Sequence, residues 1–496
     1  MTLSVPIDAP ITAPPAARTT ACGDGKTALV MGGGLAGMAA AMRLAEGGYR
    51  VTLLETRKRL GGRATSHVDP ASGEPIDNCQ HVLMGCCTNL IDLYDRLGAT
   101  NSIEWHDTLH FRDREGRDSV LKADRLPAPL HLARAAASFR GLTLREKSSA
   151  GRALLAALAT SPSGRARWRD ISFADWLRDH KQSPAAIERV WETVTISALN
   201  APASAVSAAY ALQVILQGFM GHRDAYRVGV PRVPLVALYD ALQAILARNG
   251  GEVRLGSAVR SIVVGSQTNT IEAVQTSDGS SLSADVYVSA VPADRLAAIA
   301  VASPGLNDDR LARLSEFTYS PTIGIHLHYD RRILPHPHIA FIGSPVQWLF
   351  DAANGAATTD APQQLRAVSS AADAWVELPG DEIIRLAQDE IATYLPAAKE
   401  AHLLDAKVIK ERRATFNPSP GVDHIRPSAC VVGNGVRNLF LAGDYCQTGW
   451  PATMEGAVRS GYLAAAAITG QKCGVADLPC ANRYRAATFT PEMLTA

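Results

Sequence analysis

The chain has 496 residues, of which 47% are hydrophobic, 20% charged and 6% aromatic. This is the composition of a soluble globular protein with about two or three domains, and it excludes a disordered, collagen-like or coiled-coil chain. Lys and Arg number 49 and Asp and Glu number 48, so the net charge is only +1. A nearly neutral chain lacks the positive field that attracts nucleic acid, and we expect no nucleic-acid partner.

The first 26 residues are rich in Ala, Pro and Thr and have neither the cationic start nor the apolar run of a signal peptide. We expect a disordered tail there. The eight cysteines show no paired C-x-x-C spacing, which argues against a structural zinc site and a secreted disulfide framework. Reduced thiols in a cytoplasmic enzyme are expected instead.

A strand–turn–helix–strand unit is predicted to begin at Thr27 and end at Glu55, with the glycine-rich turn at 32–37. In this setting the glycines let a dinucleotide pyrophosphate approach the backbone at a helix N-terminus. The acid that closes the second strand accepts hydrogen bonds from ribose hydroxyls and repels a 2′-phosphate. The unit therefore predicts binding of FAD or NAD rather than NADP. Its predicted cofactor contacts are Gly32, Gly34, Leu35, Ala36, Gly37 and Glu55.

A second glycine pair follows in Leu60-Gly61-Gly62-Arg63. The two glycines expose backbone N–H groups, and the Arg63 guanidinium can neutralise pyrophosphate charge. The alternative is an ordinary turn with a surface arginine. Such a pair just past the ribose acid is common in flavoproteins and is not expected in nicotinamide dehydrogenases. FAD is therefore the predicted cofactor, with Gly61, Gly62 and Arg63 as further contacts.

Residues 101–231 have mainly helical patterns and include a strongly basic part. Nine Lys and Arg residues occur from Arg125 to Arg169, together with a single acid, Glu146. This part is either a solvated helical surface or a patch that docks on anionic lipid. The apolar residues among these basic ones are Leu130, Leu132, Phe139 and Leu142.

A stretch without charged residues runs from Thr193 to Gly221 and is long enough to cross a bilayer. It also contains Asn200, Pro202 and several serines and glutamines. We therefore expect a buried helix that lines an apolar cavity rather than a transmembrane helix.

The next part of the chain alternates between strand and helix patterns. The predicted elements are a helix at 235–248, strands at 252–264, 271–276, 282–290 and 320–330, a loose stretch at 352–373 and a helix at 381–395. Asp278-Gly279 predicts a hairpin turn. Val259 is a further predicted cofactor contact.

Four histidines form two i, i+2 pairs, His326 with His328 and His336 with His338. No third ligand is suggested for either pair, so we expect no metal site. The adjacent Cys86 and Cys87 are interpreted as packing residues.

The C-terminal run from Leu441 to Ala457 has the pattern of a second cofactor-binding block. A strand at 438–442 leads into Gly443-Asp444, where the glycine allows close backbone approach and the acid can bind ribityl hydroxyls. A helix is expected to start near Pro451, with this proline in its first turn. The amides around Thr453 and Met454 would then be directed at the flavin pyrimidine ring. The alternative is a plain capped helix.

With these blocks, the chain resembles the superfamily of FAD-dependent amine oxidases and phytoene desaturases from Thr27 to about residue 470. Within it, the chain is most similar to the bacterial hydroxysqualene dehydroxylases, also called squalene-associated FAD-dependent desaturases. The segments that carry this likeness are 60–64, 77–83 and 449–457. Related sequences more usually have glycine at the position of Cys79.

The resemblance implies reductive removal of the allylic hydroxyl of hydroxysqualene to give squalene, in hopanoid and isoprenoid biosynthesis. It implies an FAD cofactor, a long-chain isoprenoid substrate and an electron donor that the sequence does not identify. Asp77 or His81 could supply the proton for the leaving hydroxide; alternatively, both residues only hold the loop below the flavin.

Three alternative functions remain. The first is an oxidative phytoene- or carotenoid-type desaturase, in which electrons flow the other way. The second is a non-redox flavin-dependent isoprenoid isomerase, and the third is a flavin-bearing membrane scaffold without catalysis. Amine oxidation is disfavoured because the apolar stretch suits isoprenoids better than small amines.

We expect an α/β fold in which a discontinuous Rossmann-like FAD-binding domain carries an inserted mixed α+β substrate domain. The predicted parts are a tail (1–26), three FAD-binding segments (27–100, 232–300 and 425–470), a helical, membrane-facing segment (101–231), a segment of sheet and helices (301–424) and a C-terminal tail (471–496). The expected location is the cytoplasm, peripheral on the inner face of the bacterial membrane.

Overall fold

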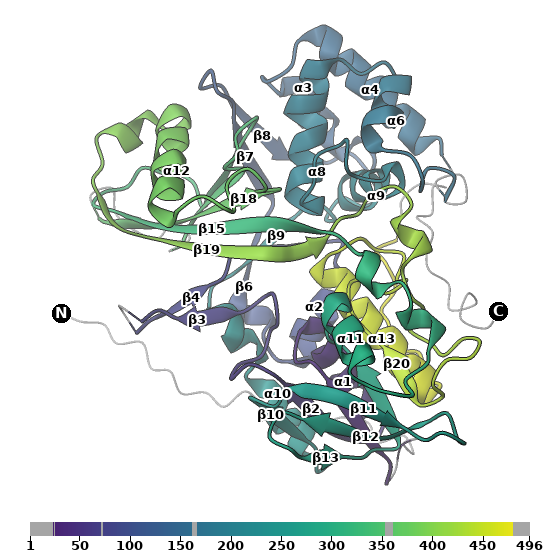
Figure 1. Ribbon diagram of the computed structural model, residues 1–496. Helices are drawn as coiled ribbons and strands as arrows, with labels where there is room; N and C mark the ends of the chain where they lie inside the picture. Colours follow the sequence, from purple (N-terminus) through teal and green to yellow (C-terminus); the bar gives the residue numbers. More distant parts are fainter. Residues whose placement is uncertain (1–22, 24, 71–72, 161–165, 353–360, 480–496) are drawn as a thin grey trace.

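A parallel sheet of five strands forms the base of the computed structural model (Figure 1). Its strands, in spatial order, are β10 (Glu252–Leu255), β2 (Arg50–Glu55), β1 (Thr27–Met31), β14 (Val286–Ser289) and β20 (Leu439–Leu441). Three distant parts of the chain therefore build one sheet. The structure describes residues 23, 25–70, 73–160, 166–352 and 361–479.

Two small-residue helices pack against each other above this sheet, α1 (Leu35–Glu46) and α13 (Met454–Thr469). Helix α1 is buried along almost its whole length, which suits its run of alanines. At Gly461 of α13 a Cβ atom would clash with the backbone carbonyl of Ala36 and approach Ala40 N to 2.8 Å. Glycine at 461 therefore permits the close contact of the two helices.

A small antiparallel sheet extends the base through β11 (Val259–Val264), β12 (Ile271–Thr276) and β13 (Ser281–Leu282). The hairpin turn predicted at Asp278-Gly279 is confirmed, because Gly279 has a φ of +84° and β12 pairs with β13 across it. The strand pattern predicted at 252–264 is confirmed as two strands, β10 and β11, which belong to different sheets. At Gly256, φ is +71°, and the chain leaves one sheet there and enters another.

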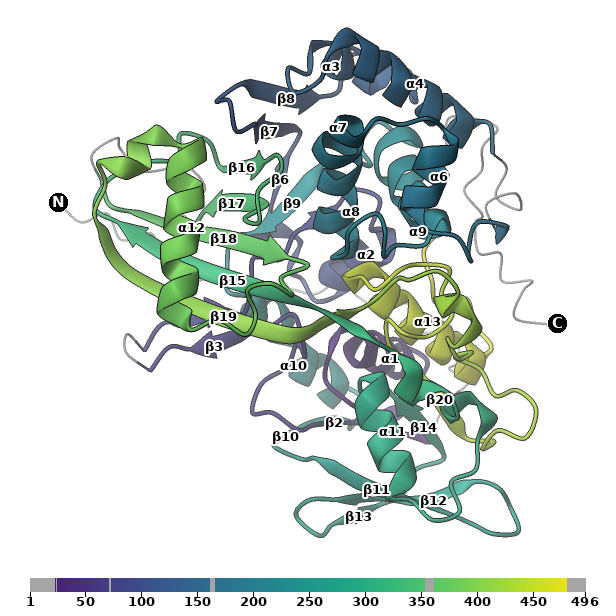
Figure 2. The same ribbon diagram turned by 45° about the horizontal axis from the view of Figure 1, so that its top comes forward.

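The second large sheet has seven strands and crosses the middle of the molecule. Its order is β19 (Leu403–Phe416), β15 (Tyr319–Tyr329), β18 (Gln363–Ser370), β17 (Trp348–Asp351), β16 (His338–Phe341), β7 (Thr108–Arg112) and β8 (Asp118–Lys122). Helix α12 (Gly380–Tyr394) covers one face of it (Figure 2). Strand β15 confirms the half-buried strand predicted at 320–330, with Ile323, Ile325 and Leu327 in the core.

Two parts of this sheet were not predicted. Strand β18 lies inside the stretch expected to be loose, because its pairing with β15 and β17 comes from residues distant in sequence. The segment 101–231 contains strands as well as helices. Of these strands, β7 and β8 belong to the seven-stranded sheet, whereas β6 (Ile103–His106) and β9 (Val228–Pro231) belong to a separate three-stranded sheet. Short pairings also join β5 (Leu83–Met84) to β9 and β3 (Ser66–Val68) to β4 (Pro75–Asp77).

The helices of the segment 101–231 gather beside the seven-stranded sheet (Figure 2). They are α3 (Ala133–Ser138), α4 (Leu144–Leu158), α6 (Phe173–Asp179), α7 (Pro184–Ala186), α8 (Glu192–Leu199) and α9 (Ala208–Gln213). Further helices in the base are α2 (Thr88–Arg96), α10 (Ala241–Ala247) and α11 (Ala293–Val301).

The expected single helix across the uncharged stretch is wrong. Helix α8 ends where Asn200 adopts a left-handed conformation, with φ of 55°. The Asn200 side-chain amide donates hydrogen bonds to Ser320 O at 3.2 Å and to Thr415 Oγ1 at 3.0 Å, and so ties the helical segment to the sheet. In the part of the chain that the structure describes, no helix is long and apolar enough to cross a bilayer.

The ends of the chain are described only in part. Of the predicted N-terminal tail, most lies outside the described residues. Residues 473–477 of the predicted C-terminal tail pack on the base. Arg43 donates to Cys473 O, and Asn89 exchanges hydrogen bonds with the backbone of Val475. The six cysteines within the described residues are free thiols.

Candidate functional site

The glycine-rich turn joins β1 to α1 in a conformation that requires its glycines. Gly32 has a φ of +108°, and a Cβ there would lie 2.8 Å from Ala290 O. A Cβ at Gly37 would clash with Gly32 O. Helix α1 begins with Gly34 as N-cap and has no side-chain cap among the described residues. The first-turn N–H groups are therefore donors for an anion at the positive end of the helix.

Glu55 lies beside this turn with its side chain largely buried. Its Oε2 accepts the N–H of Gly33 at 2.7 Å and its Oε1 accepts the N–H of Arg57 at 2.8 Å. A carboxylate oxygen has two lone-pair sites, so each oxygen retains one for a hydroxyl. The backbone thus fixes the predicted ribose acid next to the glycine turn.

The second glycine pair packs directly on the first. Gly61 N donates to Gly33 O at 2.9 Å, and Gly62, with φ of +59°, would place a Cβ 3.1 Å from the Cα of Gly34. The two predicted phosphate-binding loops are therefore one surface. Any side chain at Gly62 would be strained and would push the loops apart.

Arg63 bridges to the C-terminal block. Its guanidinium donates to Asp444 Oδ1 at 2.5 Å and to Ala414 O at 3.1 Å. Burial opposes the charged form of Arg63, but the Asp444 carboxylate outweighs it and raises the pKa of the guanidinium. Neighbouring Gly443 donates its N–H to Ser460 Oγ at 2.7 Å, which fixes this turn against helix α13.

Helix α13 starts later than the sequence indicated. Thr453 is its N-cap and accepts the N–H of Gly456 at 3.0 Å, so Met454 is the first helical residue and Pro451 lies before the helix. Thr453 takes the capping role that a proline cannot provide. Glu455 is fully buried and accepts the N–H groups of Asn89 and Leu90 at 3.1 and 2.8 Å, which caps helix α2.

A third block, residues 77–81, is tied to the second glycine pair. Asn78 donates to Arg63 O at 2.5 Å, and its own N–H donates to Thr65 O at 3.0 Å. The backbone at Cys79 is in close contact with the backbone of strand β15. The glycine that permits this contact is Gly324 of β15, where a Cβ would lie 3.0 Å from the Cα of Cys79. Burial raises the pKa of the Cys79 thiol to about 12, so the thiol is protonated and unreactive.

Asp77 is buried and its carboxylate is surrounded by donors. Oδ1 accepts from Ser66 Oγ at 2.6 Å and from the N–H of Leu235 at 3.0 Å, while Oδ2 accepts from Arg366 at 3.2 Å. These three donors hold the carboxylate in one position within the loop. This arrangement favours the loop-holding role for Asp77 over the role of proton donor.

His81 is half-buried, and its Nδ1 lies 3.0 Å from Cys79 O. A carbonyl oxygen only accepts, so Nδ1 carries the proton in the neutral ring and Nε2 keeps a lone pair. Burial lowers the pKa of His81. The ring is therefore neutral at pH 7 and is better suited to accept a proton than to donate one.

Val259 is the first residue of strand β11. The segment just before it is hydrogen-bonded to the backbone of Glu55 and Arg57. Gly256 N donates to Arg57 O at 3.0 Å and Ser257 N donates to Glu55 O at 2.8 Å. Val259 thus lies near the nucleotide end of the predicted site. Its cofactor contact stays a prediction.

The histidine pairs occupy different places. His326 lies within hydrogen-bond distance of Asp77 O, at 2.9 Å, and so supports the third block. His336 stacks on His110 with ring centroids 3.8 Å apart, and His338 meets His106 edge-on at 5.0 Å. Within the described ranges, no group of three His, Cys, Asp or Glu residues is arranged to hold a metal ion.

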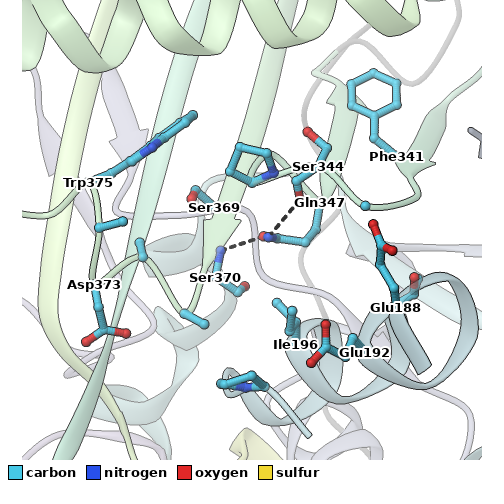
Figure 3. A pocket seen from close by; sticks show the side chains of 17 residues that line it. Glu188, Glu192, Ile196, Phe341, Ser344, Gln347, Ser369, Ser370, Asp373 and Trp375 are labelled. Atoms are coloured by element: carbon cyan, nitrogen blue, oxygen red, sulfur yellow. Dashed lines mark hydrogen bonds between the residues drawn. The ribbon is translucent and has the colours of Figure 1, made fainter. Parts of the chain in front are cut away.

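A cavity of about 400 Å³ opens between α8 and the seven-stranded sheet (Figure 3). Apolar Ile196, Phe341 and Trp375 line it, together with the carboxylates of Glu188 and Glu192. Burial, with a smaller effect of Glu188, raises the pKa of Glu192. The volume lies in the usual range for small-molecule sites, roughly 300–1,000 Å³.

The three blocks fit a dinucleotide that carries a pyrophosphate. They provide an uncapped helix N-terminus, two glycine turns in contact and a buried acid with spare acceptor sites. The family model described as flavin containing amine oxidoreductase matches residues 35–469. The chain belongs to this family. Its cofactor is accordingly FAD, as the sequence predicted.

Carotene desaturases are among the curated relatives that this chain resembles. The chain is 28% identical to the 15-cis-phytoene desaturase of Synechococcus elongatus over 465 residues, which cover 89% of this chain and 96% of the relative. It is 27% identical to the zeta-carotene desaturase of Synechocystis sp., with 88% and 96% covered.

Solved structures of the family confirm the fold class. Putrescine oxidase superposes with a TM-score of 0.68 at 19% identity, covering 90% of this chain and 99% of that one. Cyclohexylamine oxidase from Brevibacterium oxydans gives 0.63 at 21% identity, with the same coverage. The family match makes the chain an FAD-dependent oxidoreductase, and the solved structures support a Rossmann-like cofactor domain with a substrate domain.

Two residues of the site escaped the sequence analysis. Arg366 reaches Asp77 and Gln80 from strand β18, with a distance of 3.0 Å to Gln80 Oε1. Gly324 provides the close backbone contact at Cys79. Neither lies in a local motif, and only the pairing of distant strands brings them to the third block.

Proposed function

We propose that this chain exchanges a hydride between FAD and an allylic carbon of a long-chain isoprenoid, and that it works as an oxidative desaturase of the phytoene type. Its likeness to phytoene and zeta-carotene desaturases along 88–90% of the chain is the observation that carries the proposal. FAD, when bound, supplies the hydride acceptor. Desaturation removes one hydrogen as this hydride and a second as a proton.

His81 is the proposed acceptor of that proton. Its neutral ring presents Nε2 as a base, since Nδ1 is engaged by Cys79 O. Asp77 and Arg366 position the loop that carries the ring. The reduced cofactor then needs an external electron acceptor.

The second candidate is reductive dehydroxylation of hydroxysqualene to squalene. The segments 60–64, 77–83 and 449–457, which resemble the hydroxysqualene dehydroxylases, favour it. In this reaction the carbon–oxygen bond breaks, hydroxide leaves with a proton as water, and a hydride from the reduced cofactor forms the new carbon–hydrogen bond. The electrons come from an external donor.

One anaerobic experiment distinguishes the two directions. Oxidised holoenzyme with phytoene and a quinone acceptor should give products with additional conjugated double bonds and bleach the flavin in a single turnover. Photoreduced holoenzyme with hydroxysqualene should leave the substrate unchanged. Formation of squalene with reoxidation of the flavin, and no reaction with phytoene, would replace the first candidate by the second.

A further inference from the structure

Four large apolar side chains are exposed in one short part of the molecule, the segment 125–158. Leu126, Leu130, Leu144 and Leu155 are 46%, 56%, 84% and 67% exposed. Exposed apolar residues scattered singly are normal, but a concentration of leucines marks an interaction surface. Helices α3 and α4 of this segment form the top of the molecule in both views (Figures 1 and 2).

Helix α4 places two exposed leucines and one arginine on the same face. Leu144, Ser148, Arg152 and Leu155 follow one another at spacings of four, four and three residues, which is one side of an α-helix. The buried residues of the helix, Ser149, Ala150, Ala153 and Ala157, occupy the opposite side. The face of the helix that is exposed to solvent therefore carries both apolar and basic side chains.

Unpaired basic groups surround these leucines. Among the described residues, Arg125, Arg134, Arg140, Arg145 and Arg152 make no ion pair with a carboxylate, and all five are exposed. The only acid between residues 125 and 158, Glu146, is used by its own helix. Its Oε2 accepts from Thr143 N at 2.7 Å and Thr143 Oγ1 at 2.9 Å in a capping box.

We propose that the surface formed by Leu126, Leu130, Leu144, Leu155 and the five arginines docks on an anionic lipid bilayer. The leucines enter the interface between headgroups and acyl chains, and the guanidinium groups contact lipid phosphates. A positive, apolar surface without internal counter-charges is complementary to such a bilayer. Each basic group near an anionic membrane strengthens binding about fivefold. This inference goes beyond the proposed reaction and does not depend on the substrate.

The test is co-sedimentation of FAD-loaded protein with lipid vesicles. We expect the wild type to pellet with vesicles of phosphatidylcholine containing about one-third phosphatidylglycerol at low salt, and to be released at high salt. Vesicles of phosphatidylcholine alone should bind at least about tenfold more weakly. Recovery of the wild type in the supernatant with anionic vesicles overturns the proposal. The same result is expected if the surface binds an acidic protein instead of lipid.

Matched variants locate the contact. Leu144→Ser with Leu155→Ser, and separately Arg145→Gln with Arg152→Gln, should each weaken binding about 25-fold or more. Controls lie at the other end of the molecule, where Val301 is 89% exposed and Arg248 is also exposed. Val301→Ser and Arg248→Gln should bind as the wild type does. Equal loss in variants and controls, or no loss in the variants, overturns the proposal. Flavin content and Tm verify folding in each case.

Discussion

Arg63 and Asp444 are 381 residues apart in sequence, and their side chains meet at 2.5 Å. The Asp444 side chain is 7% exposed and the Arg63 side chain is 30% exposed. The pair joins the second glycine turn to the turn before helix α13. Both halves of the cofactor site are therefore held in register by one ion pair.

Loss of this pair should reduce both stability and flavin retention. We expect Asp444→Asn and Arg63→Gln each to lower the free energy of unfolding by about 1–2 kcal/mol, a modest value because the arginine is partly exposed. The double variant should cost less than the sum of the two. Thermal unfolding and the ratio of flavin to protein absorbance measure the effects. Strictly additive losses would show that the two side chains act independently.

Glu55 should contribute directly to flavin affinity. The N–H groups of Gly33 and Arg57 each donate to a different oxygen of the Glu55 carboxylate, whereas Glu55→Gln leaves only one amide oxygen to accept from either of them. We expect the Kd for FAD, measured by titration of the apoprotein, to rise about tenfold or more, equivalent to about 1.4 kcal/mol. Glu252→Gln, on the neighbouring strand, is the control and should leave the Kd unchanged. An unchanged Kd for Glu55→Gln would remove this acid from the site.

The pH profile should reveal the direction of proton transfer at His81. Burial lowers the pKa of this ring below its usual value of about 6.5, so the neutral form predominates at pH 7. A desaturase that uses His81 as base should keep its single-turnover rate from pH 8 down to roughly 6.5 and lose it in more acidic solution. His81→Gln should lose the acidic limb and most of the rate. A rate that increases on acidification would identify His81 as an acid and favour dehydroxylation.

His338 should make the fold sensitive to acid. Burial, together with His106 and His110, lowers its pKa to about 3. In the unfolded chain the ring binds a proton below about pH 6.5, whereas in the folded chain it stays neutral down to much lower pH. The free energy of unfolding therefore keeps its full value above about pH 6.5 and decreases as the pH falls towards 3. Between pH 7.5 and 5.5 the wild type should lose about 1.4 kcal/mol more than His338→Phe. Denaturant unfolding at the two pH values measures this, and equal losses in both proteins would contradict it.

The sequence predicted those parts of the site whose contacts are local. The strand, glycine turn, helix and acid between Thr27 and Glu55 follow one another directly, so spacing alone indicates their geometry. The pairing of Arg63 with Asp444 and of Asp77 with Arg366 depends on strands that meet across hundreds of residues. No local pattern carries that information.

The errors have physical causes of the same kind. The sequence of β18 predicts a loose segment because it contains several polar residues. It is a strand because it pairs on both sides, with β15 and with β17, and the pattern of the segment itself does not reveal these partners. Hydrophobicity alone predicts one helix across the uncharged stretch, because it carries no information on the conformation of Asn200. Its left-handed conformation is stabilised by hydrogen bonds to Ser320 and Thr415 of the distant sheet.

The edge position of β20 has a consequence for biosynthesis. This strand, Leu439–Leu441, completes the parallel sheet beside β14, and the turn that carries Asp444 follows it immediately. On the ribosome, β1, α1 and β2 emerge first, and several hundred residues separate them from β20. The nascent chain therefore exposes an unfinished sheet edge until β20 has emerged, and flavin capture must wait for that strand.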